Sequence, residues 1–126
     1  GVLISYCGLG YSILPEIKTF SIKGIILVSV PPIMEPQELS GLRGNFFLVY
    51  EEQNQEIPKS LLQDFTKLLS GLNIPHETKF LATNKKRWWD YSEKNYNLGI
   101  GAAGRQFILD SVSKTISLTQ KDGPKP

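Results

Sequence analysis

The run Gly24-Ile25-Ile26-Leu27-Val28-Ser29-Val30 constrains the fold of this chain more than any other segment. It is almost continuously apolar and rich in β-branched residues, whereas a strand with one solvated face alternates apolar and polar residues. Pro31-Pro32 closes the run, because proline lacks the N–H group that a sheet ladder needs. The run therefore predicts a strand covered on both faces, as in a parallel sheet between helices.

Shorter strand-like and helix-like segments alternate around this run. Strands are expected at 2–6, 45–50 and 77–82, and helices at 11–20, 36–39, 58–72 and 104–119. The third helix has the clearest apolar stripe, formed by Leu61, Leu62, Phe65, Leu68, Leu69 and Leu72. Strands that alternate with helices predict a single α/β domain, or part of one, over residues 1–120. We expect a mainly parallel sheet with helices on both faces, and a disordered tail at 121–126.

The bulk properties exclude several classes of protein. A net charge of +2 over 126 residues is too small to favour a nucleic acid or a membrane surface as partner. No apolar run approaches the roughly 20 residues of a membrane span, and no signal peptide is visible. Cys7 is the only cysteine, so no internal disulfide can form, which fits an intracellular, reducing compartment.

The start of the chain is abrupt. It lacks an initiator methionine and begins one residue before the first expected strand. This is typical of a fragment, a processed product or a portion of a longer protein. We therefore expect a protein partner, or a missing N-terminal segment, to complete the fold.

Ligands of parallel sheets usually bind at the carboxyl ends of the strands, so chemistry is expected at 7–10, 51–56 and 83–97. Gly8-Leu9-Gly10 predicts a tight turn rather than a phosphate cradle, because Ile13 stands where a third glycine would be. Glu51, Glu52 and Glu56 have no nearby His or Asp to complete a ligand set. We expect a solvated loop there, with no metal and no cofactor.

Cations and aromatics are interleaved in Lys85-Lys86-Arg87-Trp88-Trp89. Such a segment can dock a protein, because Trp and Arg dominate interface hot spots, or it can stack nucleic-acid bases. In a third interpretation one tryptophan folds back onto the domain and the lysines are solvated. All three remain open, with protein docking favoured over nucleic acid because the net charge is small.

The order of elements and loops resembles the C-terminal half of the α/β-hydrolase fold, over nearly the whole chain. The segment 2–10, VLISYCGLG, stands where that family has a nucleophile elbow, and Cys7 takes the nucleophile position, as in dienelactone hydrolases with a G-Y-C-x-G-G elbow. The segment 51–58, EEQNQEIP, resembles the family's G-x-x-D-x-x-V-P, with Asn54 in the place of the acid. The resemblance implies that the base would follow the fourth strand.

The chain departs from the family's pattern at the positions of the catalytic triad and of the elbow glycines. A triad needs a base to take the nucleophile's proton and an acid to orient that base. The single histidine, His76, precedes the fourth strand, and none follows Ala82. Ser5 and Leu9 replace the glycines of the elbow. We therefore expect a non-catalytic α/β-hydrolase-like module that acts as a structural or interaction component of a larger chain or assembly.

Two alternatives follow from other weightings of the same residues. In the first, the chain is an ester or thioester hydrolase with Cys7 as nucleophile and the rest of the site elsewhere. In the second, residues 44–123 resemble the anticodon-binding domain of class II aminoacyl-tRNA synthetases, with late strands at 98–101 and 113–120 and the basic aromatic segment on RNA. A helix over 105–120 would support the hydrolase-like fold, and a strand there would support the RNA-binding module.

Overall fold

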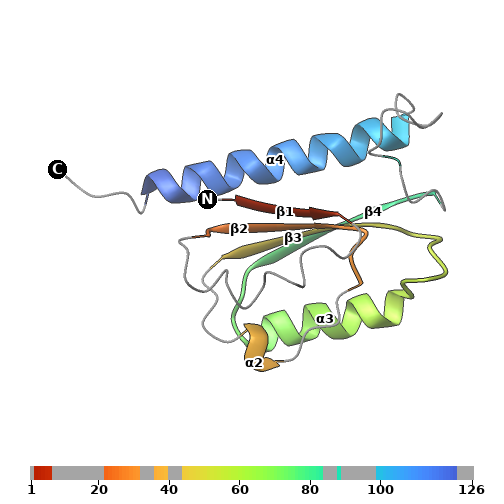
Figure 1. Cartoon of the computed structure of the whole chain (residues 1–126), viewed down its shortest axis with the longest axis horizontal. Helices are drawn as coiled ribbons and strands as arrows, with labels where there is room; N and C mark the ends of the chain where they lie inside the picture. The colour runs from red at the N-terminus through yellow and green to blue at the C-terminus, as the bar shows by residue number, and fades with distance from the viewer. Residues whose placement is uncertain are drawn as a thin grey trace.

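The computed structural model describes residues 2–6, 22–31, 36–39, 44–83, 88 and 99–121. These residues form four strands and three helices, and strands and helices alternate from β2 onward (Figure 1). The elements are β1 (Val2–Tyr6), β2 (Gly24–Val28), α2 (Pro36–Leu39), β3 (Asn45–Glu51), α3 (Lys59–Gly71), β4 (His76–Leu81) and α4 (Gly99–Lys121). The helix expected within 11–20 and the tail beyond 121 lie outside the described residues.

The four strands form one parallel sheet in the order β1-β2-β3-β4. Each strand lies beside the next in the sequence, as expected when helices make the crossovers. Ile26 and Val28 are both 0% exposed. The predicted parallel sheet, with the run at 24–30 at its centre, is confirmed, although β2 itself ends at Val28.

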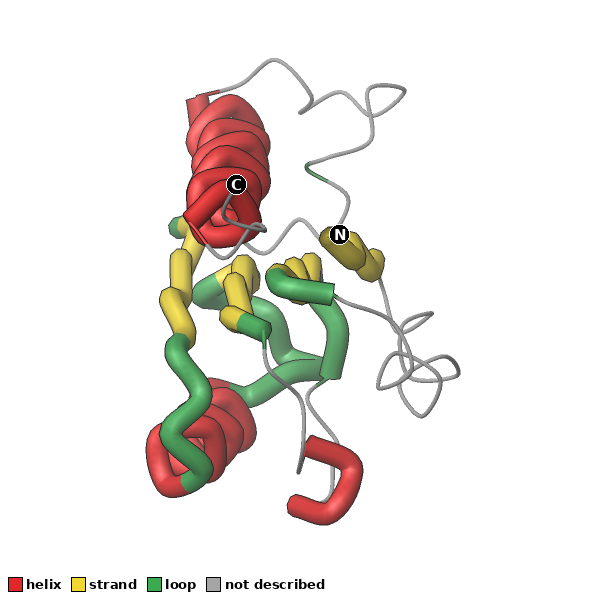
Figure 2. Tube along the Cα trace, turned by 90° about the vertical axis from the view of Figure 1, so that its left-hand side faces the viewer, coloured by secondary structure: helices red, strands yellow, loops and turns green. Residues whose placement is uncertain are grey.

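Helices cover both faces of the sheet. Figures 1 and 2 show α4 on one side, and α3 with α2 on the other. Along β2, Ile25 and Leu27 pack into the α3 face while Ile26 and Val28 pack into the α4 face. Side chains of a strand point alternately to the two faces, so burial on both sides requires the unbroken apolar run.

The α3 helix buries the stripe that the sequence predicts. Its buried residues Leu62, Phe65 and Leu69 follow at helical spacing. Phe65 meets Phe46 of β3 edge to face, with ring centroids 5.8 Å apart and planes at 82°. The helix ends at Gly71, and Asn73 then takes the left-handed conformation (φ 58°) that turns the chain into β4.

The last helix is longer than expected, because α4 begins at Gly99 and not at 104. The segment 99–104, GIGAAG, contains three glycines, which are poor helix formers. Gly101 and Gly104 are buried, so packing against the sheet stabilises a turn that local propensity does not favour. Even this 23-residue helix does not have the apolar character that a membrane span requires.

The course of α4 also corrects the RNA-binding alternative. That interpretation needs strands at 98–101 and 113–120, whereas residues 99–121 are one continuous helix. Helical spacing of Ile108, Ser111 and Thr115 buries one face of α4 against the sheet. The resemblance to an anticodon-binding domain is therefore wrong, and the hydrolase-like interpretation stands.

Candidate functional site

The carboxyl edge of the sheet gathers the loops in which chemistry is expected. Val28 pairs with Val49, and Glu51 pairs with Leu81, so the loops after β2, β3 and β4 leave the same edge. Tyr6, the last residue of β1, pairs with Val28. Cys7 follows Tyr6 in the sequence but lies outside the described residues.

A buried Ser–Glu pair links the ends of β2 and β3 at this edge. The Ser29 hydroxyl oxygen lies 2.7 Å from Glu51 Oε1 and 2.6 Å from Oε2, and it donates its single proton to this carboxyl group. Both residues are buried, at 5% and 2% exposed. Ser29 has a positive φ of 54°, and its N–H donates to the Val49 carbonyl at 3.0 Å. The pair therefore fixes a strained turn directly after β2.

The sequence does not predict this pair, and the expectation that Glu51 lies in a solvated loop is wrong, because Glu51 is the last residue of β3 and is buried. The sequence carries one signal: Glu51 follows the apolar strand 46–50 without a break, as a residue of the strand would. Its neighbours Glu52 and Glu56 are exposed, as expected of a loop. No cluster of metal-ligating side chains occurs among the described residues.

Replacing Ser29 with alanine is expected to lower the free energy of unfolding by about 1–2 kcal/mol, because a buried carboxyl loses a hydrogen-bond donor. Alanine also has a Cβ, so the backbone strain at this position stays the same. Thr66→Ala is the matched control, since its hydroxyl donates to the Gln63 carbonyl on the exposed side of α3. Urea denaturation should give a change of less than about 0.5 kcal/mol for the control. Equal losses for both variants would contradict the assignment.

Asn54, in the place of the family's acid, shapes its own loop. Its Oδ1 accepts the Glu56 N–H at 2.9 Å, and its own N–H donates to the Glu51 carbonyl at 3.3 Å. The residue is only 8% exposed. An amide carbonyl that already accepts a backbone N–H closes a turn in the loop before α3, as Asn commonly does.

His76 lies at the other edge of the sheet. It is the first residue of β4, and its Nδ1 is 3.1 Å from the Ile74 carbonyl. At about 3.3 Å per residue, the six residues of β4 separate it from the carboxyl edge by about 17 Å. His76 therefore cannot serve a nucleophile at the carboxyl end of β1.

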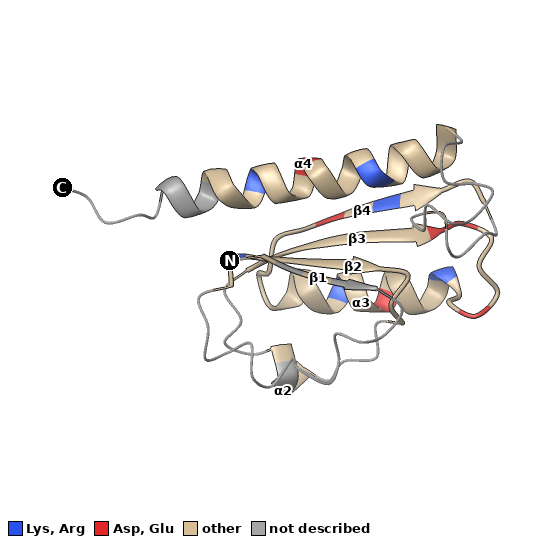
Figure 3. Cartoon of the chain, turned by 45° about the horizontal axis from the view of Figure 1, so that its top comes forward, with Lys and Arg blue, Asp and Glu red and all other residues tan. Residues whose placement is uncertain are grey.

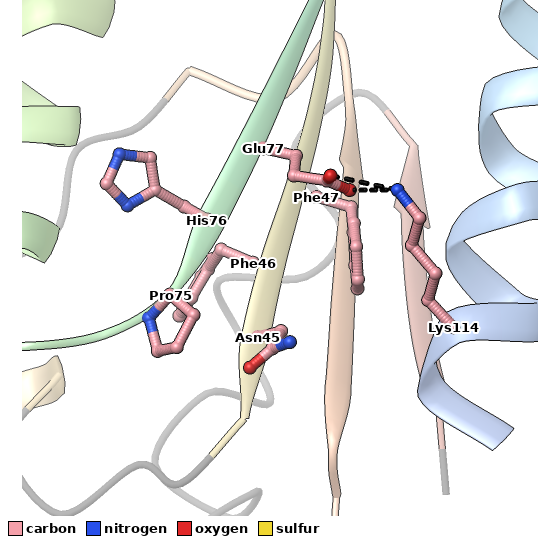
Figure 4. Close-up of a pocket in the computed structure, with 7 residues that line it drawn as sticks. All are labelled: Asn45, Phe46, Phe47, Pro75, His76, Glu77 and Lys114. Atoms are coloured by element: carbon pink, nitrogen blue, oxygen red, sulfur yellow. Dashed lines mark hydrogen bonds and ion pairs between the residues drawn. The ribbon is translucent and has the colours of Figure 1, made fainter. Parts of the chain in front are cut away.

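A cavity of about 230 Å³ opens at this amino edge (Figure 4). It is lined by Asn45, Phe46, Phe47, Pro75, His76, Glu77 and Lys114. The Glu77 carboxylate and the Lys114 ammonium form an ion pair at 2.8 Å. Figure 4 shows His76 on one side of β4 and Glu77 on the other, as neighbours in a strand must be. The two side chains thus cannot act together as an acid–base pair.

The basic aromatic segment is described only at Trp88. Its indole is 1% exposed and packs in the core under α4, beside Val49, Leu81 and Ile108. The interpretation in which one tryptophan folds back onto the domain therefore describes Trp88. Lys85, Lys86, Arg87 and Trp89 lie outside the described residues.

Comparisons with known proteins give no match to any protein-family model and none to a curated protein. Solved structures do match. One is a protein of Klebsiella pneumoniae predicted to be a dienelactone hydrolase, with a TM-score of 0.72 and 11% identity over 89% of this chain and 51% of that one. Another is a dienelactone hydrolase-like promiscuous phosphotriesterase from metagenomic libraries, with a TM-score of 0.65 and 10% identity over 90% of this chain and 52% of that one.

Identities this low establish the fold and leave activity open. The chain spans about half the length of the structures that it matches. The resemblance that the elbow-like and acid-loop segments predicted is confirmed at the level of architecture. The described part of this chain therefore has the α/β-hydrolase fold, over a span of about half of a dienelactone hydrolase-like protein.

Proposed function

We propose that this chain acts as the structural and interaction half of a dienelactone hydrolase-like domain, and that it does not hydrolyse esters by itself. The position of His76 carries the proposal. It is the single histidine of the chain, and it stands at the amino end of β4, about 17 Å from the edge where the nucleophile position lies. A general base must lie within hydrogen-bond reach of the proton that it takes.

The other polar groups of the carboxyl edge support this proposal. The Asn54 carbonyl oxygen accepts a backbone N–H, and the Glu51 carboxyl group accepts the Ser29 hydroxyl. Both side chains are buried and hold neighbouring loops together. These are roles in stability, and neither side chain lies at the amino end of β4, where the single histidine stands.

Exposed apolar side chains support the interaction role. Leu109 and Ile116 of α4 are 60% and 50% exposed, and Ile4 of the edge strand β1 is 38% exposed. Leu109 and Ile116 are seven residues apart and so share one side of the helix. Lys114 forms an ion pair with Glu77 of β4, so the side of α4 that carries Lys114 faces β4 and is opposite to the side that carries Leu109 and Ile116. We infer that the side of α4 toward β1 packs against further α/β structure, which an extension of the sheet beyond β1 would supply.

The activity of the chain alone is the direct test. With p-nitrophenyl acetate at neutral pH, we expect the chain to release p-nitrophenol no faster than its Cys7→Ala variant does. Labelling of Cys7 by iodoacetamide without ester turnover agrees with this expectation, because a thiol is nucleophilic without help. Ester turnover that disappears in Cys7→Ala would overturn the proposal.

A hydrolase is the second candidate, and the likeness to two dienelactone hydrolase-like structures favours it. In this case Cys7 attacks an ester or thioester carbonyl carbon while a base from outside this chain takes the thiol proton. The bond to the leaving oxygen or sulfur breaks, the alcohol or thiol departs with that proton, and water then hydrolyses the acyl-cysteine. Its test is the same assay on the chain in a longer native product or complex. Activity there that is lost in Cys7→Ala would support the hydrolase, and unchanged activity would exclude Cys7 as nucleophile.

A further inference from the structure

Among the described residues, nothing pairs with the outer edge of β4. β4 pairs with β3 on one side, and no other described strand lies beside it. Figure 2 shows β4 as the last strand of the sheet on the side away from β1. Glu77, Lys79 and Phe80 are exposed. Glu77 also pairs with Lys114 of α4, and the Lys59 ammonium lies 5.1 Å from the centroid of the Phe80 ring. An edge strand of this kind offers free N–H and C=O groups to another strand.

The direction of the backbone groups shows which residues offer them. The carbonyls of Pro75 and Leu81 accept hydrogen bonds from Phe46 and Glu52, at 2.9 and 2.7 Å, on the β3 side. Peptide groups alternate in direction along a strand, so the odd-numbered residues of β4 direct their backbone N–H and C=O groups toward β3. His76, Thr78 and Phe80 therefore present their N–H and C=O groups to the open edge.

The side chains of β4 are complementary to a second copy of the same strand in one register. In an antiparallel pair centred on Thr78, residue 77 of each copy lies opposite residue 79 of the other, and residue 76 lies opposite residue 80. Glu77 then faces Lys79 twice, as opposite charges, and His76 faces Phe80 twice, as aromatic pairs. Figure 3 shows the acidic and the basic position following one another on β4.

The neighbouring two-fold registers are disfavoured by the same charges. A pair centred on residue 77 places two Glu77 carboxylates opposite each other, and one centred on residue 79 does so with two Lys79 ammoniums. All three registers make even-numbered residues the hydrogen-bonded positions, so backbone direction permits each of them and the side chains select among them. Charge and the aromatic contacts thus favour the register on Thr78, which the backbone direction allows.

We propose that β4 is a dimerisation edge for a second copy of this chain. The two sheets join through an antiparallel β4–β4 pair with its two-fold axis at Thr78, into one continuous sheet. The contact leaves the β1 side free for the structure proposed above. The proposed dimer contact involves β4 alone, and it does not depend on whether the chain is catalytic.

Charge reversal tests the register. Sedimentation velocity should show a dimer of the native chain that dissociates as salt is raised. Lys79→Glu places two carboxylates opposite each other at two positions, and it is expected to weaken the dimer at least about tenfold. Glu77→Lys is expected to do the same with two ammoniums. Lys67→Glu, an equal charge change on an exposed position of α3, is the control and should leave the dimer unchanged.

Mixing the two variants gives the decisive result. Lys79→Glu and Glu77→Lys chains should be mainly monomers alone and should form a heterodimer in an equimolar mixture, since each acidic pair then meets a basic pair. Failure of the mixture to associate would overturn the proposal. So would a native chain that stays monomeric, or a dimer that both reversals leave intact.

Thr78→Pro tests the backbone contact separately. The Thr78 N–H faces the open edge, so proline there removes two hydrogen bonds of the dimer and none of the bonds between β4 and β3. We expect a monomer with an unchanged far-ultraviolet circular dichroism spectrum. A folded variant that still forms the dimer would contradict the β4–β4 pair.

Discussion

Replacing Trp88 with alanine is expected to lower the free energy of unfolding by about 3–5 kcal/mol, which is a large part of the stability of a domain this size. The indole is among the largest fully buried side chains, and it fills the space between the sheet and α4. Its Nε1–H has no hydrogen-bond partner in the described part of the chain, so loss of this buried polar atom offsets only part of the cost. Chemical denaturation followed by circular dichroism measures the change.

Leu109→Ala is the matched control for this substitution. Leu109 also belongs to α4 but is 60% exposed, so its removal from the isolated chain is expected to change stability by less than about 0.5 kcal/mol. A Trp88→Ala variant as stable as this control would show that Trp88 does not anchor α4. Trp88 would then again be a candidate for the protein-docking segment that the sequence predicts.

Gly104→Leu is expected to destabilise the chain by about 3 kcal/mol, at the upper end of the cost of overpacking. A Cβ at Gly104 would fall on Cζ3 of the Trp88 ring and within 2.6 Å of Cη2. A rigid ring cannot give way as the end of a flexible chain could, so the steric cost outweighs the gain of about 0.8 kcal/mol in helix propensity. Gly71→Leu is the control, because a Cβ there has no atom within 4 Å.

The double variant Trp88→Ala/Gly104→Leu tests the contact itself. Leucine at 104 can occupy the space that the indole leaves, so the double variant is expected to be more stable than either single variant. Losses that simply add would mean that the two residues do not share one packing site. All four proteins can be compared in one set of urea titrations.

Much of the architecture could be predicted from local pattern. The run at 24–30 has no polar face, so burial on both sides of a parallel sheet is the arrangement that it permits, and the structure confirms it. The stripe Leu62, Phe65, Leu69 follows helical spacing, and α3 forms there. The place of His76 at the amino edge of the sheet could also be predicted, because strand polarity decides the edge, although His76 is the first residue of β4 and does not precede it.

The remaining features depend on contacts between distant segments. The segment 99–104 has low helix propensity, so the sequence does not predict a helix there. Packing against the sheet and the Trp88 ring stabilises its helical conformation. The Ser29–Glu51 pair joins residues 22 positions apart, which no local pattern connects. The open edge of β4 follows from its place as the outermost strand. Periodicity predicts which faces are apolar, whereas three-dimensional neighbours decide which polar groups are buried together and which edges stay unpaired.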